Sequence, residues 1–143
     1  MLDSYRDLID SLLDTPSALR GVLEDHAAGD AAAEVRRLIA ELRDRDRVVL
    51  ARLQTVMAGH DPRLSVLVAS SPEAGEDATG LLAEMDTARG DLISLLMNLT
   101  LKDWERTATH ETDGEITLAD EVERHVEFDE DHLAKVRATV AMA

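Results

Sequence analysis

The sequence predicts an all-α protein, a single-domain four-helix bundle with mostly antiparallel helices that spans residues 1–143. Apolar residues recur at helical spacing in four long segments. Hydrophobic residues make up 45% of the chain but aromatic residues only 2%, so the core must be aliphatic, which favours helix packing over a β-sandwich. A chain of 143 residues is also long enough to bury one core. Together these observations indicate one helical bundle.

The composition excludes several classes of function. Acidic residues outnumber basic ones 30 to 15, and the formal charge of −15 argues against nucleic acid and anionic membranes as partners. The absence of cysteine excludes disulfides, thiolate metal sites and cysteine nucleophiles. No stretch approaches the roughly 18 apolar residues of a membrane span, and the N-terminal segment is amphipathic and acidic rather than signal-like. We therefore expect a cytoplasmic protein.

The first half of the chain predicts two helices. The first runs from about residue 2 to residue 26, and Pro16 is expected to break it, with Thr15 as the cap of the part that follows. The second runs from about residue 31 to residue 58. Within it, Arg45 falls inside the apolar stripe and either faces a polar centre or covers apolar surface, while Glu41 lies at the border. The remaining charges, Asp46 among them, are typical of a solvated, salt-bridged face.

The middle of the chain predicts a loop, a third helix and a polar link. Residues 63–76 are expected to form a loop over one end of the bundle, because a single strand there would have no partner. The third helix spans about residues 77–99, and Arg89 near its stripe is expected to cover apolar surface. Thr100 predicts a capped short turn, and Trp104 an anchor against the core. Residues 105–116 are expected to cross the surface without regular structure.

The last predicted helix, Thr117–Val140, carries polar residues in the middle of its apolar face. Thr117 and Asp120 form its capping signature. Burying an imidazole or a carboxylate without partners is costly, so the polar centre requires an explanation. A metal site, a buried hydrogen-bond network and a solvated cleft all fit the pattern. The stripe consists of Leu118, Val122, His125, Asp129, His132, Val136 and Val140.

Three sequence features together resemble a known family. They are Thr15-Pro16, a long second helix ending in an Arg-Leu pair, and the segment DWERTATHETDGEITL at 103–118 before a terminal helix with His132-Leu133. This pattern resembles the DinB/YfiT-like superfamily. The resemblance implies a four-helix bundle, often dimeric, with a divalent metal bound by three histidines. It also implies activities such as thiol-dependent S-transfer or maleylpyruvate isomerisation with low-molecular-weight thiols.

The metal motif of that superfamily carries over onto this sequence in part. Glu41 stands where the first histidine is expected, His132 matches the last, and Phe128 occupies the position four residues before it. Two outcomes stay open. In the first outcome, the metal has been lost, Phe128 fills its space, and the bundle binds a partner or an apolar ligand. Alternatively, Glu41, His125, Asp129 and His132 form a remodelled, oxygen-rich site for Zn, Mn, Fe or Ni.

Two hypotheses about function follow. The leading one is a DinB-like protein without an assigned biochemical role, related to metal-dependent thiol S-transferases and isomerases, with a degraded or remodelled metal site. If it is active as a transferase or hydrolase, Glu41 and His132 would hold a cation that lowers the pKa of a small-molecule thiol or a water. The alternative is a non-catalytic bundle for dimeric interaction or small-ligand binding. Leucine and valine near residues 64–68 are candidates for a homodimer interface.

Overall fold

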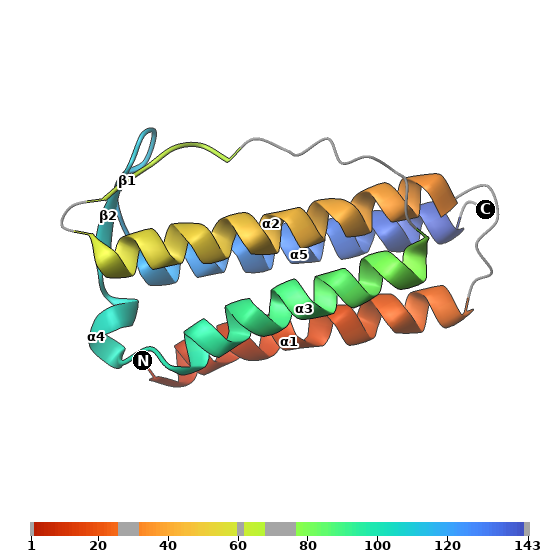
Figure 1. Cartoon of the computed structure of the whole chain (residues 1–143), viewed down its shortest axis with the longest axis horizontal. Helices are drawn as coiled ribbons and strands as arrows, with labels where there is room; N and C mark the ends of the chain where they lie inside the picture. Colours follow the sequence, from red (N-terminus) through yellow and green to blue (C-terminus); the bar gives the residue numbers. More distant parts are fainter. Residues whose placement is uncertain (1, 26–31, 60–61, 68–76, 142–143) are drawn as a thin grey trace.

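The computed structural model describes residues 2–25, 32–59, 62–67 and 77–141. Four long helices form the body of the molecule: α1 (Leu2–Asp25), α2 (Ala32–Ala58), α3 (Ala78–Met97) and α5 (Leu118–Ala141). A short helix α4 (Leu101–Trp104) and three strands, β1 (Arg63–Leu64), β2 (Thr107–His110) and β3 (Gly114–Thr117), lie at one end (Figure 1). None of the helices in these ranges is long and apolar enough to cross a membrane.

The helices pack as a square rather than in chain order. Helix α2 packs against α3 and α5, and α1 packs against the same two helices. The antiparallel arrangement predicted from the sequence holds for α2 with α5 and for α1 with α3 (Figure 1). It is wrong for the other two neighbouring pairs, α2 with α3 and α1 with α5, which run parallel. The reason is that α3 begins at the opposite end of the bundle from the point where α2 ends.

A small sheet corrects the purely all-α prediction. Strand β1 pairs in parallel with β2, and β2 pairs antiparallel with β3. The regions around Arg63-Leu64 and within 105–116 were both expected to lack a strand partner. Instead, Arg63-Leu64 pairs with a strand of the 105–116 region, and that region also forms a hairpin with itself. Ala108, His110 and Ile116 point into the protein and are buried. Gly114 begins β3 with a φ of 73°, a conformation that favours glycine.

Helix α1 continues through Pro16, so the predicted break is wrong. A proline inside a helix lacks the N–H that would bond the carbonyl four residues earlier, which here is that of Leu12. In this bundle Arg89 donates from Nη1 to the Leu12 carbonyl oxygen at 2.6 Å. The helix persists because the carbonyl that Pro16 leaves free has a strong donor from α3.

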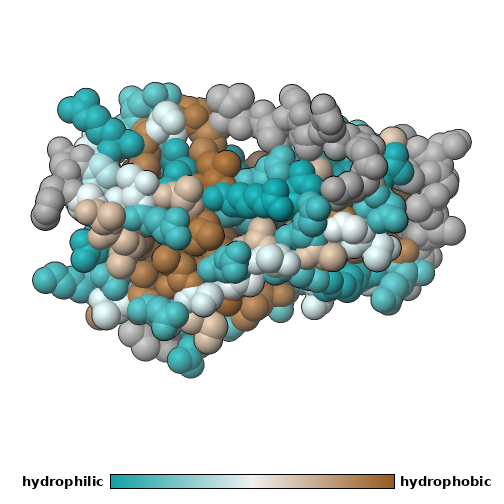
Figure 2. All heavy atoms as spheres, in the orientation of Figure 1, coloured by the Kyte–Doolittle hydropathy of each residue, from teal (hydrophilic) through white to brown (hydrophobic). Residues whose placement is uncertain are grey.

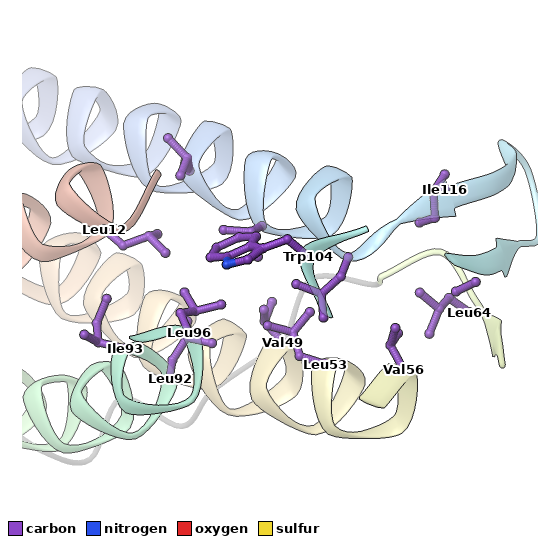
Figure 3. Packing of buried hydrophobic residues seen from close by; sticks show 14 residues of the cluster. Leu12, Val49, Leu53, Val56, Leu64, Leu92, Ile93, Leu96, Trp104 and Ile116 are labelled. Carbon is purple, nitrogen blue, oxygen red and sulfur yellow. The ribbon is translucent and has the colours of Figure 1, made fainter. Parts of the chain in front are cut away.

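The core consists of two apolar clusters. The first lies towards the sheet and surrounds Trp104, which is buried as predicted (Figure 3). The ring of Trp104 stacks on that of Tyr5 with the centroids 4.7 Å apart. The second, at the other end, contains leucines and valines of all four long helices, among them Leu19 and Val136. Polar residues separate the two clusters at mid-height, and they form the centre of the candidate site.

The surface is mainly hydrophilic on the face seen in Figure 2, with apolar residues gathered towards the end that carries α4 and the sheet. Leu64, one of the predicted interface residues, is buried at 5% exposure and is not available to a partner. Val66 is exposed at 45%. Residue 68 of that predicted interface lies outside the described residues.

Candidate functional site

Each of the four long helices contributes one side chain to a polar layer between the two apolar clusters: Thr15, Asp46, Arg89 and Asp129. Arg89 donates from Nη1 and Nη2 to the two carboxylate oxygens of Asp129 at 2.7 and 2.8 Å, and from Nε to Asp46 Oδ1 at 3.0 Å. Thr15 Oγ1 donates to Asp129 Oδ2 at 2.7 Å. Because all four residues are buried, this layer is a desolvated ion network.

The charge of Arg89 is maintained by its partners. Burial opposes a charged guanidinium, but the hydrogen bonds and negative charges of Asp129 and Asp46 prevail and raise the pKa of Arg89 above its ordinary value. A buried carboxylate pair would in turn be strongly disfavoured without a cation between its members. The two aspartates and the arginine therefore stabilise one another.

His125 lies one helical turn from this layer and is fully buried. Its Nε2 is 2.6 Å from Asp46 Oδ1. Because an ionised carboxylate only accepts hydrogen bonds, Nε2 carries the hydrogen of this contact. The other ring nitrogen, Nδ1, has no hydrogen-bond partner among the described residues. His125 is therefore oriented as a donor towards Asp46.

A second polar pair lies nearer the surface between α2 and α5. His132 Nε2 is 3.0 Å from Glu41 Oε2, and Arg37 Nη1 donates to Glu41 Oε1 at 2.7 Å. The ring of Phe128 stacks on that of His132 with the centroids 4.0 Å apart. On the ring of Phe128 lies the guanidinium of Arg45, whose carbon is 4.4 Å from the ring centroid. This pair thus sits beside an aromatic and a cationic surface.

These residues line a pocket of about 260 Å³, which we call the α2/α5 pocket. It combines charged groups from both helices with apolar side chains. Burial lowers the pKa of Arg45 despite the favourable charge of Glu121. The lining residues are Arg37, Leu38, Glu41, Asp44, Arg45, Val48, Leu67, Phe128, Asp131, His132 and Lys135.

The predicted ligand residues all point inward, but they meet in separate places. Glu41 and His132 form the pair in the α2/α5 pocket, whereas Asp129 binds Arg89 and His125 binds Asp46. Within the described ranges, no group of three or more histidine, aspartate or glutamate side chains is placed to hold a metal ion. Glu41 and His132 alone supply two donors, fewer than the three or four protein ligands of typical zinc sites. The residues present do not fit a three-ligand metal centre.

Three members of the polar layer were missed or misplaced from the sequence. Asp46 was assigned to a solvated face but is 0% exposed, and Arg89 was expected to cover apolar surface but is 2% exposed. Thr15 was expected to cap a helix but bonds Asp129. Their positions at or near the borders of the apolar stripes of three helices were the available signal. What periodicity does not provide is which helices face one another.

Comparison with known proteins bears on the fold. No family model matches the chain, and no curated protein matches it. Among solved structures, it is similar to YfiT from Bacillus subtilis, described as a probable metal-dependent hydrolase with an unusual four-helix bundle topology. The TM-score is 0.78 at 18% sequence identity, over 97% of this chain and 87% of YfiT. The chain therefore has the four-helix bundle fold of YfiT, which confirms the fold that the sequence resemblance implied.

Proposed function

We propose that this protein binds a small organic anion in the α2/α5 pocket, with Arg45 as the group that recognises the negative charge. The observation that supports the proposal most is the state of Arg45. It lines the pocket, is partly buried, and its Nε is enclosed without a hydrogen-bond partner among the residues that the structure describes. A desolvated guanidinium in that state favours an anion from outside.

The acidic side chains of the pocket are already neutralised by other groups. Glu41 bonds Arg37 and His132, Asp44 bonds Arg43 at 3.0 Å, and Asp131 bonds Lys135 at 2.8 Å. None of these three carboxylates forms an ion pair with Arg45 in the described part of the chain. Arg37 and Lys135, the other cations of the described lining, are both in ion pairs. The positive charge of Arg45 is therefore the one that is available to a ligand.

The chemical nature of the ligand follows from the walls. A guanidinium donates two parallel N–H bonds to a carboxylate or phosphate. Phe128, Leu38, Val48 and Leu67 line the pocket and supply apolar contact for an organic body. The volume of about 260 Å³ is near the lower end of ligand pockets, which run from about 300 to 1,000 Å³. A small carboxylic acid with a flat or aliphatic body fits these properties.

Titration calorimetry with benzoate and with inorganic phosphate tests the proposal on the native protein and on Arg45→Gln. Hydrogen bonds to a charged group contribute about 1.5–3 kcal/mol, so the dissociation constant of a bound probe should rise by about 10-fold to 100-fold in the variant. Arg47→Gln is the matched control, because Arg47 is exposed two residues further along α2 and does not line the pocket. Saturable binding that is equally tight in native protein and Arg45→Gln would contradict the role of Arg45.

A metal-dependent reaction is the second candidate. The Glu41–His132 contact in the pocket favours it, as does the description of YfiT as a metal-dependent hydrolase. Glu41 and His132 are only two donors in the described pocket, too few to hold an ion tightly. Metal-dependent thiol transfer and hydrolysis therefore stay predictions. Metal analysis of protein purified without a histidine tag tests this candidate: stoichiometric metal that disappears in His132→Ala would favour it, and metal-free protein that still binds the anion would favour the first proposal.

A further inference from the structure

The centre of the bundle contains a cation that belongs to the protein itself. The guanidinium of Arg89 lies between the carboxylates of Asp46 on α2 and Asp129 on α5 and is 2% exposed. It also bonds the Leu12 carbonyl on α1. A single side chain from α3 thus connects all three other long helices. In many helical bundles, carboxylates at such a position hold metal ions.

We propose that the Arg89 guanidinium serves as the resident cation of this bundle, the role that a metal ion has in other bundles, so that the chain folds and stays assembled without a divalent metal. The three acceptors that surround it come from different helices, as the ligands of a bundle metal would. The inference concerns the ion network alone and does not depend on what the α2/α5 pocket binds.

The arrangement suits a planar guanidinium rather than a spherical ion. One edge of the group makes two parallel bonds to Asp129, and the Nε side faces both oxygens of Asp46 at 3.0 and 3.1 Å. These contacts use the separate nitrogens of the guanidinium fork. A metal would instead require its donor oxygens to converge within about 2.0–2.6 Å of one point.

The backbone of α1 is also adapted to Arg89. Pro16 leaves the Leu12 carbonyl without its helical partner, and Nη1 of Arg89 fills that vacancy at 2.6 Å. Thr15, next to the proline, adds a hydroxyl bond to Asp129. Thr15 and Pro16 of α1 therefore complete the hydrogen bonding of this network. Pro16 frees a carbonyl that accepts from Arg89, and Thr15 donates to Asp129.

Chemical rescue of Arg89→Ala tests the inference. Removing one partner from a buried ion network leaves uncompensated charge, and we expect Tm to fall by about 10 °C or more. Millimolar guanidinium chloride should restore at least half of that loss by occupying the vacated space. Equal concentrations of NaCl, MnCl₂ or ZnCl₂ should restore none of it. Arg47→Ala, an exposed arginine on α2, should retain the native Tm and show no response to guanidinium.

Two further measurements keep the test decisive if Arg89→Ala does not fold. Arg89→Lys retains the charge but lacks the fork, so its Tm should also lie well below the native value. The native protein should have the same Tm in EDTA, in Mn²⁺ and in buffer alone. A native Tm that falls on chelation, or a variant stabilised by a divalent ion and not by guanidinium, would overturn the inference.

Discussion

Two arginines of this protein have the same charge and opposite environments. Arg89 is buried between two carboxylates that raise its pKa. Arg45 lies on the ring of Phe128, and burial lowers its pKa. A fully paired cation has nothing further to bind, so Arg89 is a structural cross-link. The Nε of Arg45 has no hydrogen-bond partner among the described residues, and such a desolvated cation gains most from a ligand, which is why we propose Arg45 as the binding group.

Position 128 offers a test of whether the second polar pair can be extended to a metal site. Phe128 and His132 are one helical turn apart and stack, so Phe128→His would add a third donor beside Glu41 and His132. We expect this variant to bind Zn²⁺ or Ni²⁺ at least 10-fold more tightly than the native protein, as measured by competition with a metal indicator. Phe128→Leu removes the ring without adding a donor and should show no gain. Equal affinity in all three proteins would mean that position 128 does not face the pair.

At the level of residues, the sequence predicted which side chains of the last helix point inward but not what they touch. The stripe of the last helix was correct, including His125, Asp129 and His132, because periodicity determines the face of a helix. Their partners lie on α1, α2 and α3, between 40 and 114 residues away in the chain. An arginine near an apolar stripe more commonly extends to solvent, so Arg89 was misjudged for a general reason.

At the level of elements, two short reciprocal caps connect the helices to the sheet end. Thr100 and Asp103 cap α4, and Thr117 and Asp120 cap α5 through the same pair of bonds. Both caps were predicted from the sequence, the first as a capped short turn at Thr100 and the second as the capping signature of Thr117 and Asp120. The two caps lie on either side of the β2–β3 hairpin and define where the chain enters α4 and α5.

The cap of α4 predicts a pH-dependent contribution to stability. The backbone bond from Thr100 and the side-chain bond from Arg106 lower the pKa of Asp103 below its ordinary value of 3.8. A carboxylate with a depressed folded-state pKa stabilises the fold above its unfolded pKa and loses that effect as pH falls through the folded value. Asp103→Asn should therefore lower the urea midpoint at pH near 7, and the difference from native protein should shrink below pH 3.8. The exposed substitution Asp91→Asn is the control; a difference that persists unchanged in acid would contradict the assignment.

The errors at this scale have identifiable causes. Pro16 was expected to interrupt α1 because its lost hydrogen bond is usually costly. The donor that compensates for it, Arg89, lies 77 residues along the chain from its acceptor Leu12. The hairpin was missed because β2 and β3 have four residues each and carry mostly polar side chains, too short for a clear alternation. The long helices were placed to within a few residues because their periodicity extends over many turns.

At the level of the whole molecule, a layer of ions divides one aliphatic bundle into two cores. The layer contains one side chain from each long helix, so it fixes the register of all four. We infer that such a layer contributes specificity of packing more than net stability, since buried ion pairs lose hydration that their attraction only partly restores. The parallel α2/α3 pair could not be predicted, because helix direction depends on how far a connection travels.

The overall charge constrains how a ligand is recognised. With a net charge of −15 the protein repels anions at long range, although salt at about 0.15 M screens this beyond about 8 Å. Recognition of an anion must therefore come from short-range N–H contacts at Arg45. A homodimer and a cytoplasmic location stay predictions. Analytical ultracentrifugation of the native protein would determine the oligomeric state.

The most direct test of the account is the side-chain Nε–H resonance of Arg45, assigned by its loss in Arg45→Gln and followed by NMR while benzoate is added to native protein. We predict a saturable shift of this resonance, with the Arg89 resonance unchanged because its donors are already bonded to Asp46, Asp129 and Leu12. An Arg45 resonance that does not move while benzoate binds elsewhere, or that moves only in proportion to added salt, would contradict a binding site at this position.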